Sequence, residues 1–165
     1  KSMNKERSYF LKILKEAIKM VYKEERFLLN FTGGDREGLE QSFVFRTGIH
    51  LSNLMDKNVI DGLDLDSEYT KNHNQPKSTQ RYLNGLKPDL IIHERDSNKR
   101  NKLVAEFKGW WNNDRTSDFE KLEDLTSLND NYHFLIGVFV EIGREKAAFN
   151  YFINGTEEDN YDLLT

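Results

Sequence analysis

The sequence of 165 residues has no cysteine, only two prolines and no long run of apolar residues. Without cysteine, a disulfide framework and a thiolate metal site are both excluded. No apolar run approaches the length of a membrane span and no signal-peptide core is visible, so we expect a cytoplasmic protein without membrane association. Charged residues make up 32% of the chain, but its apolar residues recur at regular spacings, which argues against disorder.

The length suits one domain with a core of its own, so residues 1–165 are predicted to form a single domain. The formal net charge is -4. This balance argues against a protein that coats nucleic acid, because such proteins are usually basic overall. It still allows an enzyme with an acidic site and a few basic residues around it.

Residues 88–108 carry the strongest local pattern. Two apolar runs, at 88–95 and 103–108, flank a polar segment, and this spacing predicts a β-hairpin with a longer loop. The first strand opens with an acid, and the second ends with an acid and a lysine.

The faces of this hairpin follow from a symmetric turn between Asn98 and Lys99. Ile91 then pairs with Glu106, and side-chain alternation places Asp89, Ile91 and His93 on the face that carries Glu106 and Lys108. Asp89 and Glu106 become diagonal neighbours, about 7–8 Å apart, which is close enough to share one cation. A slip of one residue would move one set to the other face.

Two amphipathic helices are predicted before the hairpin. Apolar residues recur at three- and four-residue spacings from about 4 to 26 and again from about 36 to 55, with Asp35 as N-cap of the second helix. The inward stripe of the second helix is Phe43, Val44, Thr47, Leu51 and Leu54.

Glu40 lies one turn before this stripe. An acid beside a buried stripe needs a partner or a metal ion. Two interpretations stay open: Glu40 contributes to a functional site, or it lies at the rim and pairs with Arg36 or Arg46.

Between the second helix and the hairpin, residues 63–69 alternate as a half-exposed strand does. Glu68, at the end of this strand, is an additional candidate acid, although such a face is usually just solvated. Residues 70–85 are polar and predict an extended loop or lid.

After the hairpin, Ser117 and Glu120 form a capping box, which predicts a helix start. Its inward residues would be Phe119, Leu122, Leu125 and Leu128. Residues 132–142 form the most apolar segment and predict a central strand covered on both faces. Residues 147–153 fit one more strand or a short helix.

Nucleic-acid contacts are considered at Arg81, Lys87, Trp110 and Trp111. Adjacent tryptophans can stack on bases, but at least one of two is more often part of the core. The basic residues are more often solvated surface than phosphate contacts.

Asp89, Glu106 and Lys108 together suit metal-assisted hydrolysis. Two carboxylates plus waters can bind Mg²⁺ or Mn²⁺, and the backbone carbonyl of Phe107 could add a ligand. Such an ion lowers the pKa of bound water, and a lysine nearby offsets negative charge. Each motif alone is weak, because a cross-strand pair of acid and lysine is ordinary sheet chemistry.

Pro88-Asp89 followed by Glu106-Phe107-Lys108 resembles the PD-(D/E)XK nuclease superfamily, the restriction-endonuclease-like fold. The resemblance implies an α/β fold with an αβββαβ core over about 35–142 and a mixed sheet flanked by helices, here with an N-terminal helical extension over 1–30. It also implies that Asp89 and Glu106 bind the metal, that Lys108 is the catalytic lysine, and that an acid on the preceding helix, matched by Glu40, joins them. Glu68 and His93 are additional candidates outside the short motif.

The resulting expectation is a Mg²⁺- or Mn²⁺-dependent nuclease that hydrolyses phosphodiester bonds, with DNA as the expected substrate and a homodimer left open. The alternative is a catalytically inactive module of the same fold that binds nucleic acid or a protein. A third interpretation is an α/β interaction protein whose acids are surface residues, and it requires Asp89 and Glu106 to lie on opposite faces.

Overall fold

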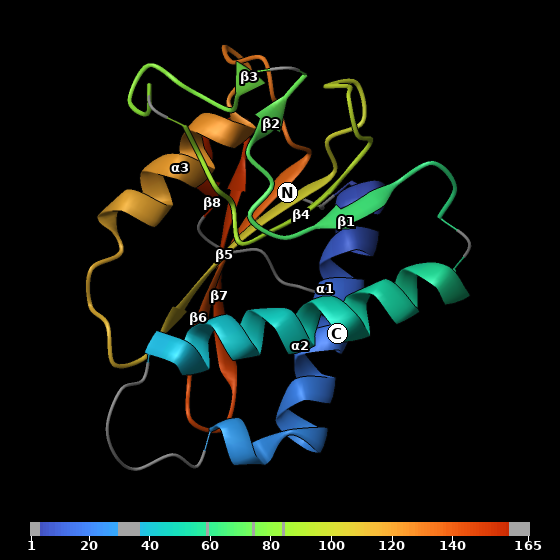
Figure 1. Ribbon diagram of the computed structural model, residues 1–165, viewed down its shortest axis with the longest axis vertical. Helices are drawn as coiled ribbons and strands as arrows, with labels where there is room; N and C mark the ends of the chain where they lie inside the picture. Colours follow the sequence, from blue (N-terminus) through green and yellow to red (C-terminus); the bar gives the residue numbers. More distant parts are fainter. Residues whose placement is uncertain (1–3, 30–36, 59, 74, 84, 159–165) are drawn as a thin grey trace.

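The computed structural model describes residues 4–29, 37–58, 60–73, 75–83 and 85–158 (Figure 1). The helices are α1 (Lys5–Glu24), the 3₁₀ helix η1 (Arg26–Leu28), α2 (Glu37–Lys57) and α3 (Thr116–Thr126). The strands are β1 (Asp64–Asp66), β2 (Lys71–Asn72), β3 (Gln75–Pro76), β4 (Leu90–His93), β5 (Leu103–Gly109), β6 (Ile136–Ile142), β7 (Ala147–Ile153) and β8 (Thr156–Glu158). The predicted order of the main elements is therefore confirmed, and Asp35 lies outside the described residues.

Six strands form one mixed sheet in the order β1-β4-β5-β6-β7-β8. All neighbours are antiparallel except β5 and β6, and α3 supplies the crossover that two parallel neighbours require. β2 and β3 form a small sheet of their own within the segment predicted as a loop or lid. Residues 147–153 are a strand, which settles that open alternative.

The register of the β4–β5 hairpin differs by two residues from the predicted one. Leu90 pairs with Ala105, so the next position brings Asp89 directly opposite Glu106 rather than diagonal to it. A shift of two residues keeps every side chain on its face. The predicted faces therefore hold, although the predicted pairing of Ile91 with Glu106 is wrong.

The cause of this shift is the turn. The observed pairs centre the turn between Ser97 and Asn98 rather than between Asn98 and Lys99. Glu94 N–H closes the loop by donating to the carbonyl oxygen of Arg100 at 3.3 Å. Asp96 adopts a φ of 58° in this loop, a left-handed conformation that aspartate tolerates better than most residues. Residue patterns alone did not reveal this closure.

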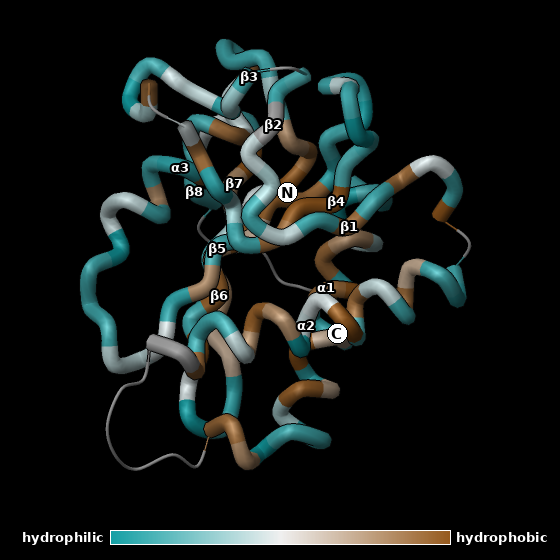
Figure 2. The backbone as a smooth tube through the Cα atoms, in the orientation of Figure 1, coloured by the Kyte–Doolittle hydropathy of each residue, from teal (hydrophilic) through white to brown (hydrophobic). Residues whose placement is uncertain are grey.

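Each face of the sheet has its own apolar core. On one face, Leu90, Ala105 and Phe107 pack with residues of α1 and α2. On the other face, Ile91 and Val104 pack with residues of α3. Figure 2 shows this pattern as apolar central strands surrounded by polar loops. The helices thus flank a mixed sheet on both sides, as predicted.

The two N-terminal helices bury the stripes that their spacing predicts. In α1, Leu11, Leu14, Ala17 and Val21 are fully buried, so this helix is part of the core rather than an appendage. In α2 the predicted stripe of residues 43–54 is buried as well. None of the described helices is long and apolar enough to cross a membrane.

Two details predicted for α3 are wrong. The helix begins at Thr116 after Arg115, without a side-chain cap, so Ser117 is not its N-cap. The hydroxyl group of Tyr82 instead lies 3.1 Å from both the Ser117 carbonyl oxygen and Glu120 Oε2. Leu128 is 62% exposed because the helix has already ended at Thr126.

Candidate functional site

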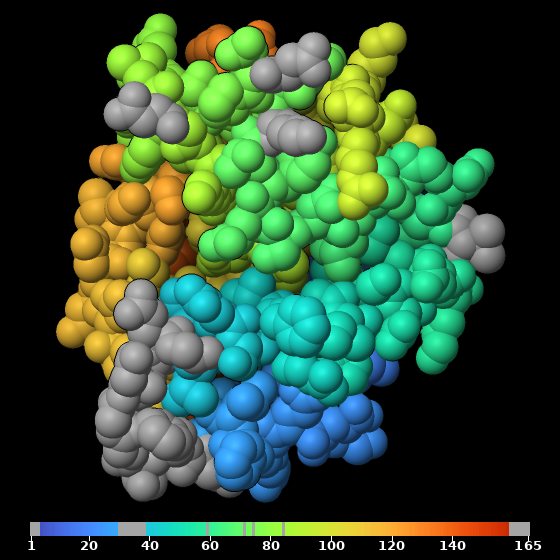
Figure 3. Space-filling model, viewed as in Figure 1, coloured from blue at the N-terminus to red at the C-terminus, as the bar shows by residue number. Residues whose placement is uncertain are grey.

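Four elements bring charged side chains together beside the end of β5. Asp89 directly precedes β4, Glu106 and Lys108 lie on β5, and Asp118 lies in the first turn of α3. Glu40, near the start of α2, reaches the same end of β5. Figure 3 shows the face on which α2, in cyan and teal, lies below the green part of the chain that leads from α2 to β4.

Asp89 is held by the main chain of the neighbouring strand. Its Oδ2 accepts a hydrogen bond from Phe107 N–H at 2.7 Å. The pKa of Asp89 is raised to about 6, chiefly by burial and also by the charges of Asp118 and Glu40, and hydrogen bonds from Phe107 N–H and with Glu106 partly offset the rise. At neutral pH the Asp89 carboxylate is therefore ionised although burial and the neighbouring acids disfavour its negative charge.

Glu106 is more deeply enclosed, with 2% of the residue exposed. Its Oε1 has no hydrogen-bond partner among the described residues. Burial raises the pKa of Glu106 well above its usual range, and the negative charge of Asp89 raises it again. Two carboxyl groups placed this closely cannot both ionise without a compensating cation.

This pair fits a hard divalent cation. Carboxylate oxygens are the ligands that Mg²⁺ prefers, and Mg²⁺ usually keeps several waters and takes only one or two carboxylates. The orphaned Glu106 oxygen and the crowded charge of Asp89 are the features that such an ion would relieve. In the described part of the chain, no three acidic or histidine side chains form a ready-made metal cage, so water would have to complete the coordination.

Lys108 lies at the edge of the pair. Its Nζ is 2.9 Å from Asp118 Oδ2, and only 18% of its side chain is exposed. Burial works to lower the pKa of Lys108, but the hydrogen bond and the charge of Asp118 outweigh it and raise the pKa. Lys108 is therefore a protonated ammonium group at neutral pH.

Glu40 contacts the site, and Arg46, one of the two arginines considered for it, pairs elsewhere. Its Oε2 accepts a hydrogen bond from Gly109 N–H at 3.0 Å. Arg46 instead forms an ion pair with Glu25, and Arg36 lies outside the described residues. The placement of Glu40 favours the interpretation in which it contributes to the site.

Asp118 and Lys121 are site residues that sequence reasoning missed. Lys121 Nζ lies 3.4 Å from Asp118 Oδ1. Their signal in the sequence is an acid and a lysine three residues apart at a helix start, a pattern shared by many solvated helices. Only the packing of α3 against β5 distinguishes them.

Glu68 and His93 do not join this cluster. Glu68 N–H donates to the carbonyl oxygen of Pro88, but its side chain is exposed. His93 Nε2 is 2.7 Å from Asp66 Oδ2. His93 lies four positions after Asp89, which is about 13 Å along a β-strand. The shared face was predicted correctly for His93, but distance along the strand keeps it out of the site.

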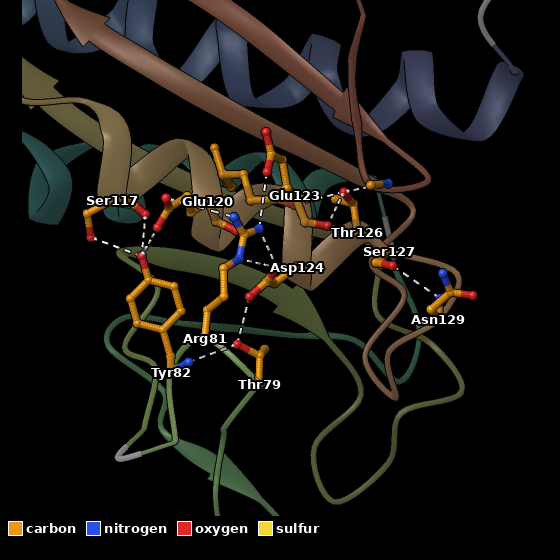
Figure 4. A network of polar contacts seen from close by, with 12 residues as sticks. Thr79, Arg81, Tyr82, Ser117, Glu120, Glu123, Asp124, Thr126, Ser127 and Asn129 are labelled. Atoms are coloured by element: carbon orange, nitrogen blue, oxygen red, sulfur yellow. Dashed lines mark hydrogen bonds and ion pairs between the residues drawn. The ribbon is translucent and has the colours of Figure 1, made fainter.

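Arg81 is not placed to meet a phosphate group. Figure 4 shows it directed at α3, where its guanidinium group binds Asp124 and Glu123, with Nε 3.0 Å from Asp124 Oδ1. The nucleic-acid contact predicted for it is therefore unsupported, because acids of the same chain already occupy this arginine. Lys87, by contrast, is exposed.

The two tryptophans pack against each other, edge to face, with ring centroids 4.7 Å apart. Trp110 is partly buried against the core shared by α1 and α2, as expected for at least one of the pair. The ring of Trp111 lies over Gly109, where an added Cβ would come within 2.3 Å of it. This close approach explains the glycine that directly follows Lys108.

Comparison of the chain with models of protein families, with curated proteins and with solved structures found no match.

Proposed function

We propose that this chain is a metal-dependent nuclease of the restriction-endonuclease-like fold. The observation that carries the proposal is the convergence of Asp89, Glu106, Lys108 and Glu40 at one end of β5. The mixed sheet, with α3 between its two parallel strands, supports the same fold.

Asp89 and Glu106 would hold Mg²⁺ or Mn²⁺. Phe107 donates its N–H toward Asp89, and the N–H and C=O of one strand residue face the same neighbour, so its carbonyl is a candidate third ligand. The bound ion would polarise a phosphoryl oxygen and lower the pKa of a bound water.

The protein's own side chains have separate tasks in this scheme. Lys108 is protonated, so it stabilises the negative charge that develops on the phosphoryl group rather than acting as a base. Glu40 adds negative charge near Asp89 and holds the main chain of Gly109. Both act at fixed positions, which lowers the cost of reorganisation during the reaction.

The expected substrate is nucleic acid, and DNA in particular. Lys87 is exposed two positions before Asp89 and is therefore placed to contact a backbone phosphate. The acidic net charge of -4 implies a local rather than a general attraction for nucleic acid. The cytoplasmic location and the homodimer considered for this chain remain predictions.

The second candidate is a catalytically inactive module of the same fold. The ion pair between Lys108 and Asp118 favours it, because a lysine held by an internal acid is less available to a substrate. The two candidates differ in cleavage, and binding of nucleic acid would be common to both.

The test is Mg²⁺- or Mn²⁺-dependent cleavage of single- and double-stranded DNA and RNA. We expect Asp89→Ala and Lys108→Ala to reduce cleavage by about 100-fold or more. The exposed residues Asp56 and Lys99 supply matched controls, Asp56→Ala and Lys99→Ala, which should cleave as the unaltered chain does. Equal residual cleavage in all variants would indicate contamination and reject the nuclease.

Calorimetric titration with Mn²⁺ separates the two candidates from a protein whose acids have no such role. Loss of Mn²⁺ binding in Glu106→Ala, without cleavage by the unaltered chain on any substrate, would leave a metal-binding but inactive module. Unchanged Mn²⁺ binding in Glu106→Ala would show that the carboxylate pair is not the metal site.

A further inference from the structure

The acid of α3 that contacts Lys108 has no part in the short motif. We propose that Asp118 is a positioning residue, which holds the Lys108 ammonium group in place beside the Asp89–Glu106 pair. This proposal rests on the proposed nuclease function and assigns a task to a helix that the motif does not include.

Both oxygens of Asp118 face ammonium groups. Oδ2 lies 2.9 Å from Lys108 Nζ and Oδ1 lies 3.4 Å from Lys121 Nζ. The side chain of Asp118 is only 7% exposed, and a buried charge is costly unless it is paired. Both carboxylate oxygens therefore lie within ion-pair distance of a lysine, which favours a role in holding Lys108.

Lys108 needs such an anchor. Lysine carries a point charge on a flexible four-carbon stem, so its ammonium group has no fixed position without a partner. Asp118 is close enough for its own charge to act on both Asp89 and Glu106. The contact that fixes Lys108 therefore lies within the site and not at its periphery.

The helix that carries Asp118 is itself held in place. Figure 4 shows residues 79–82 bound along α3. Thr79 Oγ1 donates to Asp124 Oδ2 at 2.7 Å, and Arg81 binds the same carboxylate. Leu86, further along the same segment, packs in one core with Ile91 of β4 and with Leu122 of α3, so the helix that carries Asp118 is held against the strand that follows Asp89.

The experiment compares Asp118→Asn with Lys108→Ala and with the double variant. We expect Asp118→Asn to lower kcat by on the order of 100-fold, with KM and Mn²⁺ affinity nearly unchanged, because misplacement of a catalytic group by about 1 Å has that effect. The double variant should be no slower than Lys108→Ala, since Asp118 acts through Lys108. Asp118→Glu, which keeps the carboxylate, should recover part of the rate.

A second readout does not depend on cleavage. The nitrogen-15 chemical shift of the Lys108 ammonium group should differ from that of the exposed lysines. In Asp118→Asn it should move to the value of the exposed lysines. The matched control is Glu6→Gln, which removes the acid from the ion pair with Lys102 at the opposite end of β5. It should leave both the rate and the Lys108 signal unchanged.

Three results would overturn the proposal. Multiplied rate losses in the double variant would show that Asp118 acts independently of Lys108. Loss of Mn²⁺ binding in Asp118→Asn would make Asp118 a metal ligand instead. An unaltered Lys108 signal in Asp118→Asn would show that the acid does not hold it. Absence of cleavage by the unaltered chain would reject the proposed nuclease function. The contact between Asp118 and Lys108 would then have no catalytic role.

Discussion

The most direct test of the crowded carboxylate pair is the stability of Asp89→Asn without metal. Asparagine has nearly the shape of a protonated aspartate and can still accept the hydrogen bond from Phe107 N–H. The substitution removes a carboxylate that is ionised in a buried place, beside the buried carboxyl group of Glu106. We therefore expect it to stabilise the metal-free protein while it weakens metal binding.

The magnitude follows from the pKa of Asp89, which is about 6 in the folded chain against an ordinary value of 3.8. Each pKa unit corresponds to about 1.4 kcal/mol, so ionised Asp89 lowers the free energy of unfolding by about 3 kcal/mol. For a domain of this size, that difference amounts to a melting temperature about 6–12 °C higher in Asp89→Asn.

The pH dependence has a definite sign. The folded chain keeps the Asp89 proton to higher pH than the unfolded chain does, because the pKa is raised on folding. The contribution of this group is therefore fully present below about pH 4 and is lost as the pH rises through 6. Asp89→Asn and the unaltered protein should be equally stable at about pH 4 and should differ most at about pH 8.

The assay is chemical or thermal unfolding in EDTA across this pH range, with the exposed Asp56→Asn as control. Addition of Mn²⁺ at about 100 times its Kd should stabilise the unaltered protein by about 2.7 kcal/mol and the Asp89→Asn variant by less. The argument is refuted if Asp89→Asn is less stable than the unaltered protein at about pH 8 in EDTA. It is equally refuted if the difference between them does not depend on pH.

Three further substitutions test the packing around the site by chemical denaturation. Arg81→Ala removes the half-exposed group that binds α3 and should lower the free energy of unfolding by about 1 kcal/mol. Tyr132→Phe removes the buried hydroxyl bonded to Ser78 and should lower it by about 1–2 kcal/mol. Thr47→Val should be neutral or stabilising, because Thr47 Oγ1 is buried without a hydrogen-bond partner in the described part of the chain. A stability gain in Arg81→Ala or Tyr132→Phe, or a clear loss in Thr47→Val, would contradict the packing described for that residue.

The hairpin shows which part of the site the sequence could predict. Alternation along β4 and β5 assigned Asp89, Glu106 and Lys108 to one face, and a register error of two residues did not disturb this assignment. The error arose in the loop, where a left-handed residue and the backbone hydrogen bonds that close the hairpin set the turn. Such features depend on local conformations that residue types only bias.

Contacts between elements were predicted less well. Glu40 was placed beside a buried stripe by helical spacing, but its bond to Gly109 N–H depends on how α2 crosses the sheet. Arg81 was a surface cation in the sequence, and the structure instead binds it to three acids of α3. The spacing of charged residues along the sequence does not indicate which residues they will pair with.

The sequence by itself determined the order of the elements, their inward faces and the side of the hairpin that carries the acids, because spacing along one chain controls all three. Tertiary structure alone decided that Asp118 and Lys121 stand beside Lys108, and that Asp89 and Glu106 lie directly opposite each other. These facts depend on the packing of α3 against β5 and on the closure of one loop. The chemistry proposed for this site depends on both kinds of information, since the motif supplies the groups and the packing sets their charges against one another.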